Sequence, residues 1–141
     1  MSRPQTLAEV VSTIVAGAKS FGVAMDEFVD AFYLDHPDKV SQQRRLNDAP
    51  AVTDDAFMDA WIGAVGEHLA RRWNLDVPPW TRKSERYRLS SPRFIPDSKA
   101  LRRTLLVESP AAFRSRMIFT FVEPLQRARF PRDAKRIGEP A

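Results

Sequence analysis

The chain has 141 residues, of which 43% are hydrophobic and 28% charged, with a net charge of +4 and no cysteine. These values are typical of one ordinary globular domain, and they exclude a disordered chain, disulfides, thiolate metal sites and a cysteine nucleophile. No apolar run approaches the roughly 18 residues that cross a bilayer, so we expect a cytoplasmic protein that does not enter a membrane.

Two helices are predicted at the start of the chain. The first covers about residues 7–19, because Thr6 and Glu9 form a capping-box pattern and apolar residues then recur at helical spacing. The second covers about 24–34, and Gly22 in the connection is suited to a turn with positive φ. A short polar helix is expected to begin at Pro37.

The first two helices have the outline of a helix–turn–helix over residues 7–34. A DNA-reading second helix presents Arg, Lys, Asn, Gln or Ser to bases and phosphates. This one presents Asp26, Glu27 and Asp30, which phosphates would repel. The pattern therefore favours a packing hairpin, and a DNA-binding transcriptional regulator using residues 7–34 stays as the alternative.

The strongest predicted helix follows Thr53, its expected cap, and ends near Arg72. Its expected core stripe consists of Phe57, Trp61, Ala64, Val65, His68 and Leu69. We expect Trp61 to be buried against the first two helices, in contact with Val11, Ile14 or Phe28. His68 on this stripe is interpreted as a core residue rather than a base or a ligand.

No pattern of catalytic or metal-binding residues emerges. Asp55 and Asp59 lie four apart, as two metal ligands on a helix would, but no third ligand follows at suitable spacing, so stabilisation of the helix dipole is favoured. The chain lacks a Ser-His-Asp signature and a glycine-rich phosphate loop. We therefore expect a protein that is not an enzyme and has no cofactor or metal.

Helical periodicity stops after Trp73. Residues 74–97 contain four prolines, four arginines and one lysine and predict one long Pro- and Arg-rich loop, a length typical of functional segments. Short helices are expected from Ser98 and from Pro110. The segment 118–122 is expected to be extended chain or helix, because no partner strand is visible, and the tail after 131 is expected to be mobile.

The predicted fold class is all-α. We expect a compact bundle of about five to six helices with the long loop at about 74–97. The single domain would have an acidic helical N-terminal half, residues 1–73, and a basic C-terminal half, residues 74–141.

The charge is distributed unevenly between the halves. Residues 1–70 hold 5 Lys or Arg and 11 Asp or Glu, a balance of −6, whereas residues 71–141 hold 17 and 7, a balance of +10. Such asymmetry indicates a polyanionic or acidic partner for the basic half. The alternative is that the acidic half covers the basic half in the fold, and both interpretations remain open from the sequence.

Arginine outnumbers lysine 14 to 3 in residues 71–141, which favours specific recognition of anions. Trp80, Tyr87 and Phe94 lie among these arginines, as in surfaces that stack nucleic-acid bases, or else they fix the loop to the core. We predict Trp80 to be such an anchor. The predicted partner- or anion-binding residues are Arg82, Arg86, Arg88, Arg102, Arg103, Arg114 and Arg116.

The segment 68–119 resembles the C-terminal region of uncharacterised bacterial proteins, in which it often follows a helix–turn–helix domain. Some of these proteins are similar to the regulator or antitoxin of toxin–antitoxin-like gene pairs. The resemblance rests on Trp73, Pro79, Trp80, Ser109, Pro110, Phe113, Arg114 and Phe119. It implies an interaction or regulatory protein of the antitoxin type, and it transfers no catalytic residue. Together with the Arg-rich C-terminal half, it predicts a non-catalytic protein that binds an acidic protein partner or a nucleic acid.

Overall fold

The computed structural model describes residues 4–131. Its α-helices are α1 (Leu7–Val15), α2 (Phe21–Leu34), α3 (Lys39–Asn47), α4 (Ala56–Arg72), α5 (Arg102–Glu108) and α6 (Ala111–Arg114). Single 3-10 turns form η1 (Pro79–Arg82), η2 (Ser84–Arg86) and η3 (Lys99–Leu101), and the strands are β1 (Arg93–Phe94) and β2 (Ile118–Phe119). The predicted helical fold class is confirmed, with one small sheet added. The tail after 131, which is expected to be mobile, lies outside the described residues.

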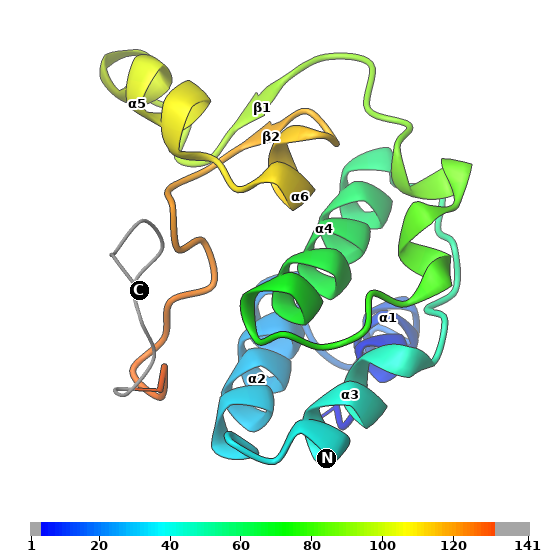
Figure 1. Cartoon of the computed structure of the whole chain (residues 1–141). Helices are drawn as coiled ribbons and strands as arrows, with labels where there is room; N and C mark the ends of the chain where they lie inside the picture. Colours follow the sequence, from blue (N-terminus) through cyan, green and yellow to red (C-terminus); the bar gives the residue numbers. More distant parts are fainter. Residues whose placement is uncertain (1–3, 132–141) are drawn as a thin grey trace.

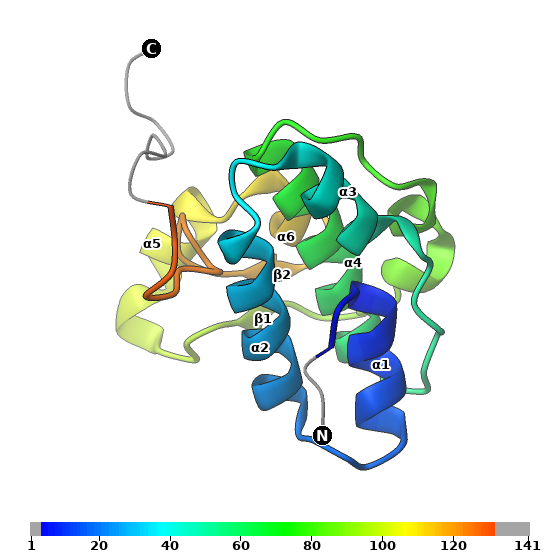
Figure 2. The ribbon, with the colours of Figure 1, turned by 90° about the horizontal axis from the view of Figure 1, so that it is seen from below.

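Helix α4 is the central element (Figures 1 and 2). The other helices of the N-terminal half, α1 to α3, lie on one side of it, and η1, η2 and α6 pack on its remaining sides. From Asp59 to Ala70 every residue of α4 except Trp61 is buried. A helix enclosed on all sides has no single core stripe, which explains why the predicted stripe describes only part of its buried surface.

The prediction that Trp61 is buried is wrong. Its ring is half-buried and lies against Phe113 of α6, with 5.0 Å between the ring centroids, and against Phe57, at 6.0 Å. The C-terminal half, and not the first two helices, therefore supplies its main aromatic neighbour.

The boundaries of the first two helices differ from the prediction. Helix α1 ends at Val15 and the glycine with positive φ is Gly17, at +74°. Gly22 lies inside α2, whose cap is Ser20. The sequence has two glycines in this region, and the earlier one, Gly17, rather than Gly22, forms the turn.

The segment 74–97 is a strap across α4 rather than a structureless loop, because it contains η1, η2 and β1. Two glycines of α4 let the strap approach closely: a Cβ on Gly66 would lie 2.7 Å from the Trp80 ring, and one on Gly63 would lie 2.8 Å from Cβ of Arg86. Trp80 is buried, and its indole N–H donates to the Leu46 carbonyl at 2.9 Å. Trp80 therefore joins the strap to both α3 and α4.

The strap also supplies the strand that the sequence did not reveal. Strands β1 and β2 pair in parallel, with Arg93 opposite Ile118 and Phe94 opposite Phe119. Two-residue strands are too short to show a period of two, so the pair is invisible to pattern analysis. Within residues 4–131, none of the helices combines the length and the hydrophobicity that crossing a bilayer requires.

Replacing Gly66 with alanine should lower the free energy of unfolding by about 1–3 kcal/mol, because the new methyl group overlaps the Trp80 ring. Gly22→Ala is the matched control. Gly22 is also helical but has open space around it, so alanine there should stabilise the protein by roughly 0.5–1 kcal/mol. Urea denaturation of both variants measures the difference, and equal effects would show that the strap does not contact α4 as described.

Candidate interaction surface

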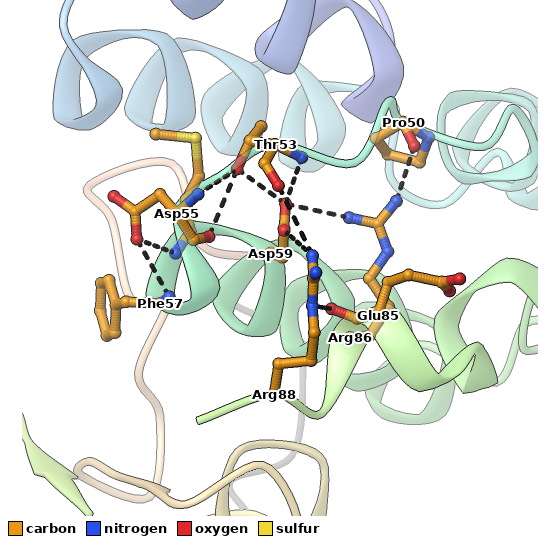
Figure 3. Close-up of polar contacts among 9 residues, drawn as sticks. Pro50, Thr53, Asp55, Phe57, Asp59, Glu85, Arg86 and Arg88 are labelled. Atoms are coloured by element: carbon orange, nitrogen blue, oxygen red, sulfur yellow. Dashed lines mark hydrogen bonds and ion pairs between the residues drawn. The ribbon is translucent and has the colours of Figure 1, made fainter. Parts of the chain in front are cut away.

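Two buried carboxylates of α4 hold arginines of the C-terminal half, and Asp59 is the first (Figure 3). One of its oxygens accepts hydrogen bonds from the backbone N–H and the hydroxyl of Thr53, both at 2.9 Å, and the other accepts from Arg88 at 2.8 Å. The guanidinium of Arg86 lies 3.8 Å away and donates to the Pro50 carbonyl at 2.6 Å. Asp59 thus connects the chain before α4 to the strap.

The helix cap beside this cluster is Asp55 and not Thr53. One oxygen of Asp55 accepts from the backbone N–H groups of Phe57 and Met58, and the Thr53 hydroxyl accepts from the N–H of Asp55. Asp55 and Asp59 therefore have separate structural roles. Among residues 4–131, no group of three His, Cys, Asp or Glu side chains is arranged to hold a metal ion.

Glu67 is the second buried carboxylate. It accepts hydrogen bonds from Arg116 at 2.9 Å and from Arg71 at 2.7 Å. The fully buried Arg116 also donates to the carbonyls of Thr81, at 2.6 Å, and Ala112, at 2.7 Å. Burial raises the pKa of Glu67, but the hydrogen bonds from the two arginines outweigh it, so the pKa lies below its usual value. This cluster joins α4, the strap and α6.

The structure places the seven predicted arginines in different environments. Arg86 and Arg116 are buried in the clusters around Asp59 and Glu67, so neither lies on a surface that a partner can reach. The remaining side chains are exposed: Arg82, Arg88, Arg102, Arg103 and Arg114. Of these, Arg88 is held by Asp59.

The exposed arginines do not gather on one face. Arg82 and Arg88 belong to or follow the 3-10 turns of the strap (light green), which in Figures 1 and 2 lie across α4 from α5. Arg102 and Arg103 begin α5. Arg102 is 3.8 Å from the exposed Asp97, and Arg103 has no ion-pair partner in the described part of the chain.

The aromatic residues of the strap all have contacts within the fold, although Tyr87 remains 39% exposed. Phe94 stacks on Phe119 with 5.2 Å between centroids, and the guanidinium of Arg102 lies 5.1 Å from the Phe94 ring. Arg116 lies 4.3 Å from the ring of Tyr87. With Trp80 buried against α4, each of the three aromatic rings has an intramolecular contact on its face.

Helix α5 carries the features that sequence reasoning missed. Only Leu105 of its seven residues is buried, whereas Leu106 is 46% exposed and Val107 is 79% exposed. At spacings of three and four these two side chains neighbour the two arginines of the first turn. We call this set the α5 face: Arg102, Arg103, Leu106 and Val107. The sequence does contain a signal for this exposure, because Leu105, Leu106 and Val107 follow one another in a short helix. A helix that packs on one side only can bury just part of such an apolar run, so some of these side chains are expected to be exposed.

The outer surface of α2 is acidic and already paired. Arg127 donates to both carboxylate oxygens of Asp30, at 3.0 and 2.9 Å, and lies 3.3 Å from Asp26. Lys19 and Glu27 form a further pair at 2.6 Å. Part of the charge asymmetry is thus neutralised within the fold, through an arginine outside the predicted seven.

Comparison with known proteins gives no relative. No family model matches the chain, and neither a curated protein nor a solved structure is similar enough to match it.

Proposed function

We propose that this protein is a non-catalytic interaction protein, regulatory or antitoxin-like, whose α5 face binds an acidic protein partner. The observation that carries the proposal is the exposure of two apolar side chains, Leu106 and Val107, directly beside Arg102 and Arg103. Apolar contacts flanked by arginine are typical of protein interfaces, in which arginine is enriched and pairs with carboxylates.

Three features of the fold support a protein rather than a nucleic acid as the partner. Single-stranded nucleic acid stacks its bases on free aromatic rings, whereas Trp80, Tyr87 and Phe94 have contacts of their own. A duplex requires cations spread along its phosphates, but the exposed arginines of the predicted seven are distributed over the strap, α5 and α6, and the turns of the strap lie across α4 from α5. Neither single-stranded nor duplex binding would make use of the exposed Leu106 and Val107.

Use of the helical hairpin α1–α2 to read DNA is the less supported alternative. The exposed surface of α2 carries Asp26 and Asp30, which would meet the phosphates and which already bind Arg127. An acidic reading helix repels the nucleic-acid backbone at every register.

Charge reversal of Arg102 and Arg103 to glutamate should abolish capture of the partner without lowering the melting temperature, because both side chains are exposed. The immobilised protein would be exposed to a nuclease-treated lysate of the source organism, with captured proteins identified by mass spectrometry. Reversal of Arg82 and Lys83, on the strap, is the control and should leave capture intact.

The salt dependence provides a second readout. Capture through exposed ion pairs should weaken steeply between about 0.05 and 0.5 M salt. Capture that survives the Arg102/Arg103 reversal, or that occurs from an untreated lysate but not from the nuclease-treated one, would contradict the proposal. The second result would instead favour a nucleic-acid ligand.

A further inference from the structure

A groove of about 430 Å3 lies where the end of α4 meets the α5–α6 connection. Its lining combines charged and apolar side chains: His68, Arg71, Arg72, Glu108, Arg114 and Val122, together with the chain from Ser109 to Ala112. The volume is within the range of roughly 300–1,000 Å3 that small-molecule sites occupy. None of the four residues of the α5 face lines it, so the groove is separate from the proposed partner surface.

His68 is the unusual group in this groove. Only 5% of the residue is exposed, and its ring packs edge-on against Phe113 with 5.5 Å between centroids. No hydrogen bond joins its nitrogens to any other residue in the range 4–131. Burial, and then the nearby Arg72, lower the pKa of His68 to about 4, so the ring is neutral at neutral pH. It offers one N–H donor and one acceptor nitrogen, both without a partner in the described fold.

Three arginines line the groove, and one of them, Arg114, can bind a ligand without giving up an ion pair seen among the described residues. Arg71 donates to Glu67, and Arg72 donates to Glu123 at 2.8 Å. Arg114 is exposed and makes no ion pair within residues 4–131. Glu108, also in the lining, disfavours a second negative charge on a ligand.

We propose that this groove binds a small apolar monocarboxylate. The carboxylate accepts hydrogen bonds from the guanidinium of Arg114 and from the N–H of His68, which gains the partner that the fold does not provide. The apolar part of the ligand lies against Ala112 and Val122. A dianion such as a phosphate monoester is a poorer ligand because it faces Glu108.

Hexanoate is a suitable probe, and hexanamide is its neutral counterpart of nearly the same shape. Titration of the 15N-labelled full chain should give a Kd on the order of 1 mM for hexanoate, the affinity range of a ligand with eight heavy atoms. Amide shifts should be confined to residues near 68, 108–114 and 122. Hexanamide should bind at least about 10-fold more weakly, because it lacks the charge that Arg114 recognises.

Two variants locate the site. Arg114→Gln should weaken hexanoate binding about 10-fold, whereas Arg82→Gln, which removes an exposed charge outside both the groove and the α5 face, should leave the Kd unchanged. Absence of hexanoate binding, equal affinity for hexanamide, or shifts centred elsewhere would overturn the proposal. Tighter binding of inorganic phosphate than of hexanoate would overturn the choice of a monocarboxylate. None of these results depends on whether the α5 face binds a protein.

Discussion

Glu67→Gln is expected to lower the free energy of unfolding by about 3–5 kcal/mol, the cost of leaving a buried charge without its counterion. The Arg116 side chain is fully buried, and within residues 4–131 Glu67 supplies the only carboxylate that pairs with it. Glutamine keeps the shape and can still accept a hydrogen bond, so the variant isolates the loss of charge. Because the pair joins α4 to both the strap and α6, the whole C-terminal half should lose stability. Urea denaturation monitored by tryptophan fluorescence measures the effect.

Arg71→Gln is the control within the same cluster. Arg71 donates to the same carboxylate but its side chain is 56% exposed, so its loss should cost only about 0–1 kcal/mol. Similar costs for Glu67→Gln and Arg71→Gln would show that Arg116 is solvated rather than enclosed by the strap.

Acidification from pH 7 to pH 4 is expected to lower the free energy of unfolding through the protonation of His68. His68 is buried in its neutral form with a pKa of about 4, against an ordinary value of 6.5, so the unfolded chain binds a proton there more readily than the folded protein. Stability that is fully present above about pH 6.5 is therefore lost as the pH falls towards 4. With about 1.4 kcal/mol for each unit of pKa, the loss is about 3 kcal/mol.

His68→Phe separates this effect from the titration of carboxylates. Phenylalanine retains an aromatic ring against Phe113 but cannot bind a proton. The difference in unfolding free energy between pH 7 and pH 4 should therefore be about 3 kcal/mol smaller in the variant than in the wild type. An unchanged pH profile would show that His68 is accessible to water and titrates normally.

Much of the fold can be predicted from local patterns. Thr6 caps α1, α4 ends at Arg72, and the chain is mainly helical, because capping residues and apolar spacing act within a few residues of each other. The sheet and the wrapping of the strap depend on pairing over longer distances. The single-turn η1 and η2 have no period that could identify them in a proline-rich segment.

Which arginines are buried and which are exposed could not be predicted either, because the partners of the buried ones lie far away in the sequence. Arg116 and Glu67 are 49 residues apart, and Arg86 reaches Pro50 across 36 residues. Nothing in the local sequence distinguishes these buried arginines from Arg102 or Arg103, which are exposed. The glycines of α4 carried a usable signal, since Gly63 and Gly66 one turn apart in a strong helix indicate a close approach of another segment.

We propose that the partner binds the exposed arginines and apolar side chains of α5, and not the acidic hairpin α1–α2. Hydrogen–deuterium exchange of the protein with and without its captured partner tests this most directly. We expect slower exchange in residues 102–108 of the complex. Exchange in residues 79–88 of the strap and in residues 21–34 of α2 should be the same as in the free protein. Protection confined to α2 or to the strap, with α5 exchanging as in the free protein, would contradict it.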